Sequence, residues 1–188
     1  MSYVDDRLSR IHRGRIIIRY IFGGAWYMTG KRFLVDRMLG KLAKKLRMLG
    51  FDTLYFSEIE ENELLTMASN EGRILLTRDK ELFEKAVKRG IETFLIKSDR
   101  WRSQISAVLK RFRISENDLK LFSRCMECNT VLKEVSKQDV VLDVPEYVYM
   151  THERFLKCPM CGKVYWAGTH VKDMIEELRK LKIPVRRE

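Results

Sequence analysis

Three aspartates each follow a short apolar run of the chain, and their positions could support chemistry. Asp36 comes after KRFLV, Asp79 after RILLTR, and Asp99 after ETFLIKS. If these runs are parallel strands of one sheet, the three carboxylates emerge at the edge where α/β folds keep their sites. Carboxylates gathered there repel one another unless a hard cation such as Mg²⁺ or Mn²⁺ lies between them. The pattern therefore predicts metal-assisted chemistry on a phosphodiester bond.

A helix cap is the alternative interpretation of each aspartate, because each one precedes a predicted helix. An Asp at an N-cap accepts a hydrogen bond from the first helical turn and stabilises the helix by about 1 kcal/mol. Loops from a strand to a helix commonly end in such a residue. A fourth acid is expected within residues 58–63, where Glu61 is our choice and Glu63 the next candidate. The helix dipole favours an acid at this position in any case.

The chain is strongly basic, with a formal net charge of +11 over 188 residues. Such a charge attracts polyanions and supports nucleic-acid binding. The candidate phosphate contacts lie on the helix expected after Asp36 or beside Asp79, and they are Arg37, Lys41, Lys44, Lys45, Arg47 and Arg78. The lysines recur at helical spacing opposite the leucines, so the solvated face of an amphipathic helix is the alternative interpretation.

An alternation of strands and helices must position these residues, and residues 31–113 have it. The predicted strands are 32–35, 51–56, 73–77 and 91–96. The predicted helices are 37–49, 61–71, 80–89 and 100–112, and a glycine follows each of the first three. Strands that alternate with helices of this length predict a parallel sheet with helices on both faces.

The four cysteines form two C-x2-C pairs, Cys125–Cys128 and Cys158–Cys161. Each pair can direct two thiolates at one ion, and two pairs complete a closed, structural Zn²⁺ site. Gly162 permits the tight turn after the last ligand. Disulfides and a redox C-x-x-C are the alternatives; the equal spacing of the two pairs favours metal.

The alternation of predicted strands and helices ends near residue 122, and loops with short strands follow. We expect a nuclease-type α/β domain over residues 31–122 and a zinc ribbon with a terminal helix over residues 123–188. The ribbon is predicted to have short strands at 131–135, 140–144 and 164–166 and a helix at about 171–181. Residues 1–30 are an N-terminal extension without an assigned role. The chain has no run of 18 apolar residues, so no transmembrane helix is expected. The apolar segment 16–28 resembles a signal peptide, but Arg19 interrupts it and no clear cleavage site follows, so a cytoplasmic location is expected.

Together these motifs resemble a known family. The segments that show the resemblance are FLVDRMLGKLAKKLRMLGFDT, ENELL, EGRILLTRD, the two C-x2-C pairs and VYWAGTHVKDM. They are similar to the "Mut-seven C-terminal" RNase domain family, a PIN-like RNase domain with a C-terminal zinc ribbon, over about residues 31–180. The resemblance implies a flavodoxin-like PIN sheet and an acidic site that uses Mg²⁺ or Mn²⁺. Asp36 and Asp79 match the strand-end aspartates of that site, Glu61 the acid before a leucine pair, and Asp99 the fourth position.

Two functions compete at this point. The first is a metal-dependent ribonuclease, in which Asp36 and Asp79 hold Mg²⁺ or Mn²⁺ and Glu61 and Asp99 complete the set of ligands. The second is a non-catalytic module that binds RNA through the zinc ribbon and the basic helix. DNA is an alternative substrate, because nothing in the sequence recognises a 2′-hydroxyl explicitly.

Overall fold

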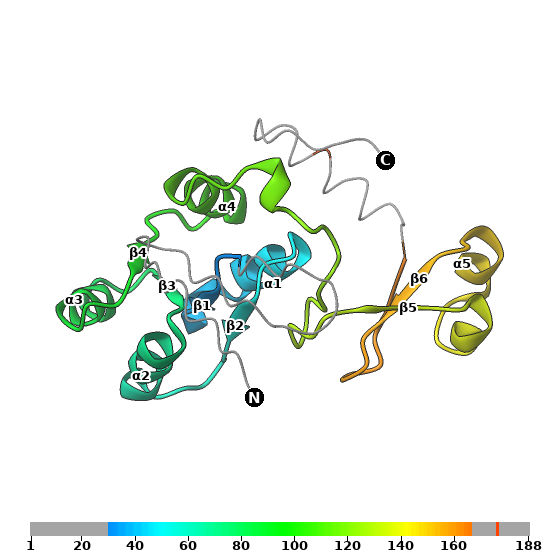
Figure 1. The fold of residues 1–188 in the computed structure, drawn as a ribbon, viewed down its shortest axis with the longest axis horizontal. Coiled ribbons are helices and arrows are strands. Elements are labelled where there is room, and N and C mark those ends of the chain that lie inside the picture. Colours follow the sequence, from blue (N-terminus) through cyan, green and yellow to red (C-terminus); the bar gives the residue numbers. More distant parts are fainter. Residues whose placement is uncertain (1–29, 167–175, 177–188) are drawn as a thin grey trace, which may run out of the picture. The chain divides into compact units, whose positions relative to one another are not determined.

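Four short parallel strands form the sheet that positions the predicted acids (Figure 1). The computed structural model describes residues 30–166 and Glu176. The strands are β1 (Phe33–Val35), β2 (Thr53–Tyr55), β3 (Ile74–Thr77) and β4 (Thr93–Leu95). Their order is β2-β1-β3-β4, and Phe33 lies opposite Thr53 on one side and Ile74 on the other. The predicted α/β class with a parallel sheet is confirmed, and PIN-like identity stays a prediction.

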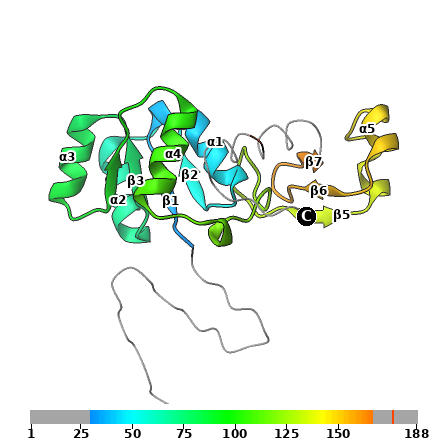
Figure 2. The same cartoon turned by 90° about the horizontal axis from the view of Figure 1, so that it is seen from above.

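Helices cover both faces of this sheet (Figures 1 and 2). They are α1 (Gly40–Met48), α2 (Glu61–Glu71), α3 (Lys80–Lys88) and α4 (Trp101–Arg111), and a 3-10 turn (Arg37–Leu39) precedes α1. Successive strand residues point to opposite faces. Phe33 and Val35 accordingly pack with the leucines of α1 and with α4, whereas Leu34 packs with α2 and α3. Both faces are buried, which explains why the strands are continuous apolar runs.

Gly50 ends the first helix where the sequence predicts it. Its φ is +96°, a conformation that glycine adopts without steric cost. A Cβ atom at this position would also collide with the carbonyl oxygen of Lys120. The backbone N–H groups of Lys120 and Phe122 donate to the carbonyls of Leu49 and Met48, at 3.0 and 2.8 Å. The end of α1 is thereby joined to the segment that leads into the first cysteine pair.

A second, antiparallel sheet follows, with the order β5-β6-β7. Its strands are β5 (Lys133–Val135), β6 (Phe155–Lys157) and β7 (Val164–Trp166). We call residues 123–166 the ribbon. A 3-10 turn (Lys137–Val140) and a short helix, α5 (Glu146–Thr151), lie between β5 and β6.

The strand predicted at residues 140–144 is wrong. Ser136 and Asp139 form a reciprocal capping box, which starts a helical turn at this point instead. Val140 and Val144 still contribute apolar side chains, and they pack on Phe155 of β6. The apolar run 140–144 therefore contributes two buried valines to the core without forming a strand, whereas Val141 and Leu142 are exposed.

Several predictions concern other parts of the chain. The terminal helix at 171–181 and the extension at 1–29 lie outside the described residues, and the division of the chain near residues 30 and 122 stays a prediction. Among the helices of residues 30–166, none has the length and apolar character needed to cross a membrane.

Candidate functional site

Asp36 lies directly after β1 and Asp79 shortly after β3, and we call this end of the sheet the acidic edge. Asp36 is only 6% exposed. It occupies the N-cap position of the following turn, yet it makes no capping hydrogen bond. Its Oδ2 instead accepts a hydrogen bond from the Thr77 hydroxyl of the neighbouring strand β3, at 2.9 Å. No residue of the described ranges donates a hydrogen bond to Oδ1, so helix capping does not explain this buried carboxylate.

Asp79 follows β3 and does cap a helix. Its Oδ1 accepts hydrogen bonds from the backbone N–H groups of Glu81 and Leu82, at 2.8 and 3.1 Å. Its own backbone N–H donates to the Thr77 hydroxyl at 2.9 Å. The buried Thr77 hydroxyl therefore connects Asp36 to the turn that bears Asp79. Thr77 was not among the predicted site residues, because its link to Asp36 depends on the pairing of β1 with β3.

Glu61 and Asp99 lie apart from this pair. Glu61 is the first residue of α2, and both its carboxylate oxygens accept hydrogen bonds from Lys85 of α3, at 2.8 and 3.1 Å. Asp99 is exposed in the loop between β4 and α4, and the buried Gln104 side chain fixes that loop by donating to the carbonyl of Ser98 at 3.0 Å. All four acids follow parallel strands. Within residues 30–166, however, no three carboxylates lie close enough together to share an ion.

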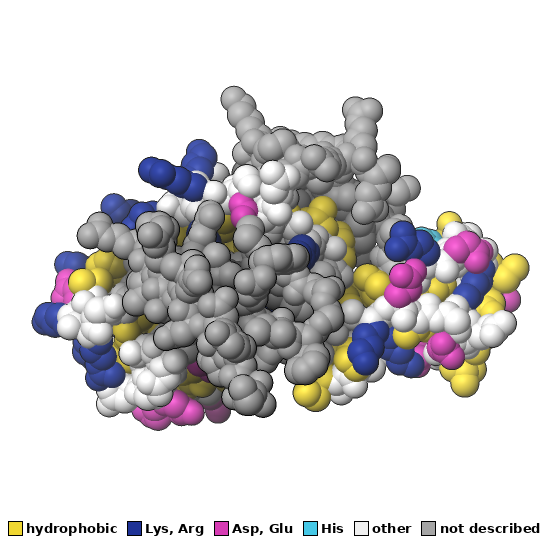
Figure 3. Space-filling model, viewed as in Figure 1, with side chains coloured by type: hydrophobic (Ala, Val, Ile, Leu, Met, Phe, Trp, Pro, Cys, Tyr) yellow, Lys and Arg dark blue, Asp and Glu magenta, His cyan; other side chains and the backbone are white. Residues whose placement is uncertain are grey.

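The predicted phosphate contacts are mostly exposed. Lys41 and Lys44 lie on the exposed face of α1, and Arg37 is exposed beside Asp36. Lys45 is half-buried with its Nζ 4.8 Å from the centre of the Trp101 ring, and burial followed by repulsion from Arg102 lowers its pKa. Arg78 is half-buried. Figure 3 shows further basic side chains around α3 and α4.

Arg47 does not belong to this exposed set. Its side chain is buried, and its guanidinium donates to the carbonyls of Thr53, Met126 and Glu127 at 2.8, 3.0 and 2.6 Å. An arginine engaged in this way is not available to a phosphate. Its role is to join α1 and β2 to the loop between the first two cysteines.

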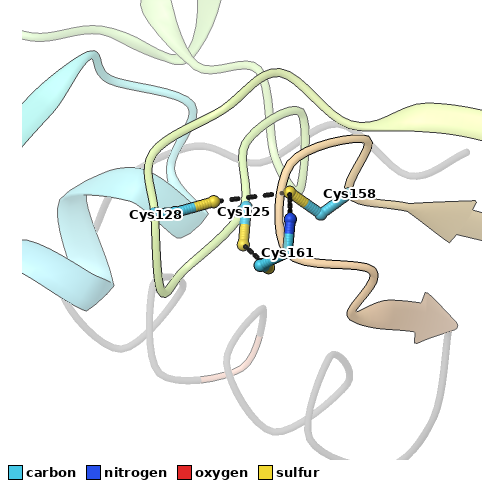
Figure 4. A group of neighbouring side chains, drawn as sticks. All are labelled: Cys125, Cys128, Cys158 and Cys161. Atoms are coloured by element: carbon cyan, nitrogen blue, oxygen red, sulfur yellow. Dashed lines mark hydrogen bonds between the residues drawn. The ribbon is translucent and has the colours of Figure 1, made fainter.

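The four cysteines converge on one point (Figure 4). Their Sγ atoms all lie within 4.8 Å of one another, with Cys125–Cys161 at 3.6 Å and Cys128–Cys158 at 3.4 Å. A tetrahedral Zn²⁺ with Zn–S bonds of about 2.3 Å separates its sulfurs by about 3.8 Å. The set of donors thus fits a closed, structural metal site such as zinc.

The two cysteine loops repeat one backbone pattern. We call residues 125–130 the first knuckle and residues 158–163 the second knuckle. In each, the first cysteine N–H bonds to the carbonyl five residues later, at 2.8 and 2.9 Å, and its carbonyl accepts from the N–H four residues later, at 3.0 Å. Asn129 (φ +67°) occupies the left-handed position that Gly162 (φ +74°) has in the second knuckle. Asparagine tolerates this conformation, and its side chain is free to add contacts.

Asn129 uses its side chain to attach the first knuckle to the start of β2. Its Oδ1 accepts from the N–H of Thr53 at 3.0 Å, and its Nδ2 donates to Asp52 at 2.7 Å. The guanidinium of Arg73, which is buried, pairs with the same Asp52 carboxylate at 2.9 Å. With Arg47, these side chains fasten the first knuckle to the parallel sheet by hydrogen bonds that are buried or partly buried.

Residues 31–178 match the Mut7-C RNAse domain, which is most of the chain. The chain belongs to this family. It is also similar to the human exonuclease mut-7 homolog, with 34% identity over 101 residues. That match covers 52% of this chain and 12% of the relative, so the chain corresponds to a small part of that protein. No solved structure matches the chain at a significant level.

Membership in the Mut7-C RNase family indicates a nuclease-type role, and a nucleic acid is therefore the expected substrate. The acidic edge around Asp36 and the cysteine site both lie within the matched range.

Thr77→Val is expected to remove one hydrogen bond from each of the two aspartates, Asp36 and Asp79, of this Mut7-C domain. The substitution keeps the side-chain size but removes the donor to Asp36 and the acceptor for the Asp79 N–H. A buried partner left without its hydrogen bond costs about 1–3 kcal/mol of stability. Under the metal-dependent function proposed below, loss of a residue that orients a metal ligand would cost about 10- to 100-fold in activity. Denaturant unfolding and nuclease rates measure the two effects, and Thr77→Ser should restore both; equal defects in Val and Ser would contradict the role of the hydroxyl.

Asp52 makes the attachment of the first knuckle pH-dependent. Burial alone would raise its pKa, but hydrogen bonds from Arg73 and Asn129 hold that pKa below its usual range. A carboxyl group with a lowered folded-state pKa stabilises the fold above its unfolded pKa of about 3.9, and this contribution disappears as the pH falls further. Asp52→Asn should therefore be less stable than wild type at pH 7, by about 1.5–3 kcal/mol for hydrogen bonds to a charged group, and the difference should shrink below about pH 4. Denaturant midpoints across this range test it, with Glu84→Gln as an exposed control; a constant difference would refute it.

Proposed function

We propose that the chain is a divalent-metal-dependent ribonuclease with a PIN-like sheet, and that its active site is the acidic edge after β1 and β3. The observation that best supports this proposal is the Asp36 carboxylate. It is buried, makes no cap, and has one oxygen oriented by Thr77 and the other without a described partner. A buried carboxylate is costly unless it is paired or binds a metal, which favours a ligand at this position.

The proposed roles follow from position. Asp36 and Asp79 hold the ion, with Glu61 and Asp99 as the further ligands from the ends of β2 and β4. When bound, Mg²⁺ or Mn²⁺ lowers the pKa of water and stabilises charge on the attacked phosphate. Thr77 fixes the Asp36 carboxylate, and the α3 cap fixes Asp79. Glu61 would have to leave Lys85 to serve the ion, so closing of the site on substrate is part of the proposal.

RNA is the proposed substrate because the matched family is an RNase domain and the chain carries a net charge of +11. Exposed Arg37 and Lys41, together with Arg78, lie on the segments next to Asp36 and Asp79 and are proposed to contact phosphates. Structural zinc at the four cysteines completes the proposal. The name of the human relative suggests cleavage from an end, and the assay below distinguishes this from internal cleavage by its products.

A non-catalytic RNA-binding module is the second candidate. The ion pair between Glu61 and Lys85 favours it, since it leaves Asp36 and Asp79 without a third nearby acid. Such a module would bind nucleic acid in a salt-sensitive manner without cutting it.

Cleavage of end-labelled RNA, and of DNA with the same sequence, distinguishes the two. Reactions with Mn²⁺, Mg²⁺ or EDTA would compare wild type with the double variant Asp36→Asn/Asp79→Asn. Metal-dependent cutting that the double variant lacks supports the nuclease. Binding without cutting under every metal condition refutes it and favours the module. DNA cutting at an equal rate would remove the preference for RNA.

A further inference from the structure

We propose that a nucleic-acid backbone passes over a composite surface in which Lys44 of α1 and Lys163 of the second knuckle contact its phosphates. This inference deepens the proposed function and rests on its nucleic-acid substrate. Neither the acidic edge nor the family match assigns a role to Lys163. This surface would extend the path of the bound nucleic-acid strand from α1 onto the ribbon.

The two lysines are far apart in the chain but share one carboxylate. Glu127, from the first knuckle, pairs with Lys44 through Oε2 at 2.8 Å and with Lys163 through Oε1 at 3.2 Å. Both lysine side chains are 54% exposed, and Lys41 lies one helical turn from Lys44 on the exposed face of α1. Two ammonium groups thus flank one carboxylate at the surface, with an excess of positive charge.

The contacts of the first knuckle with α1 and β2, which are buried or partly buried, hold this arrangement in place. Arg47 bonds to the carbonyl of Glu127 itself, and Asn129 bonds to Asp52 and Thr53. The two knuckles are in turn joined at the cysteine cluster, where Cys125 faces Cys161 and Cys128 faces Cys158. The spacing between Lys44 and Lys163 is therefore set by the fold and not by the exposed ion pairs alone.

A phosphate can take the place of Glu127 at low cost. Exposed ion pairs contribute little to stability because water solvates both partners well. Each ammonium group has three donors, so either lysine can bond to a phosphate oxygen while the carboxylate turns away. Release of counterions from the nucleic acid then favours the exchange.

Three other cations of the ribbon are each paired with a separate acid. Lys157 pairs with Asp143 at 2.7 Å and Arg154 with Glu134 at 3.2 Å, and Lys137 likewise has Glu153. Each of these cations has its own acid, and Figure 3 shows basic and acidic side chains interspersed on this part of the molecule. Among the described ion pairs, Glu127 is the carboxylate that two lysines share.

Salt-dependent binding tests the proposal. The Asp36→Asn chain would be titrated with fluorescently labelled single-stranded RNA at several salt concentrations, so that cleavage does not interfere. Lys44→Ala and Lys163→Ala should each weaken binding and make the negative slope of log K against log salt shallower by about 0.7, the value for one phosphate contact on a single strand. Lys157→Ala, which removes the same charge from the ribbon, should leave the slope unchanged.

The outcomes separate this surface from the nuclease activity. A Lys163→Ala slope equal to that of wild type or of Lys157→Ala would overturn the surface, even if wild type cuts RNA. If Lys163→Ala makes the salt slope shallower while wild type cuts no nucleic acid, the surface is supported and the nuclease is refuted. Glu127→Gln should tighten binding more than Glu153→Gln, and equal effects of the two would also count against the proposal.

Discussion

Asp36→Asn is expected to lower the rate of metal-dependent cleavage by more than about 100-fold, because even residues that only orient a metal ligand typically contribute 10- to 100-fold. Asparagine has nearly the same shape and keeps an oxygen that can accept from Thr77. The change therefore removes the charge at the acidic edge and leaves the fold and the RNA affinity largely intact. Single-turnover cleavage and RNA binding, measured on the same protein, give the two quantities.

Asp79→Asn should have a similar effect on cleavage for the same reason. Asparagine is also a good N-cap, so α3 should keep its cap and its stability. Glu84→Gln is the matched control, since it removes one negative charge from an exposed position on the same helix. If the Asn variants cut at the rate of Glu84→Gln, the acidic edge is not the active site.

Removal of the metal should have the largest effect on stability. Structural Zn²⁺ contributes about 10–16 kcal/mol of apparent binding free energy in zinc-finger peptides, and that energy is used for folding. A chelator or Cys158→Ser is therefore expected to unfold the ribbon. The loss should extend to the sheet, because Arg47 of α1 and the Thr53 N–H of β2 would both lose their hydrogen-bond acceptors in the first knuckle.

Metal analysis and thermal unfolding check this expectation. Wild type should contain one zinc per chain and melt at a markedly higher temperature than Cys158→Ser. Met160→Ser is the control, because Met160 lies between the cysteines of the second knuckle with a side chain 75% exposed. A chain without metal that melts like wild type would show that the cysteine site is not structural.

The features that the sequence could predict are those that depend on near neighbours. The strands and helices of the sheet domain follow from apolar periodicity, and Gly50 ends the first helix because its backbone requires a positive φ. The cysteine site follows from two pairs with ligand spacing, and the structure brings all four sulfurs together.

The errors arose where a residue's partner lies far along the chain. Arg47 resembles its exposed neighbours on α1, yet its acceptors at Met126 and Glu127 bury it. Glu61 was predicted to lie at the acidic edge; the structure pairs its carboxylate with Lys85 of the next helix, and its role as a ligand stays a proposal. Thr77 has no distinctive local pattern, and its importance appears only when β1 and β3 lie side by side.

The contacts at Thr53 also bear on how the protein avoids aggregation. β2 is an outer strand of the parallel sheet, and the Thr53 peptide groups point away from β1, since Phe33 bonds to Asp52 instead. Unpaired groups on such a strand are a template for another chain. Here the Asn129 side chain accepts a hydrogen bond from the Thr53 N–H, and Arg47 donates one to the Thr53 carbonyl. The first knuckle therefore shields an edge that would otherwise be open to strand pairing, and loss of the metal would leave a chain prone to self-association as well as a less stable one.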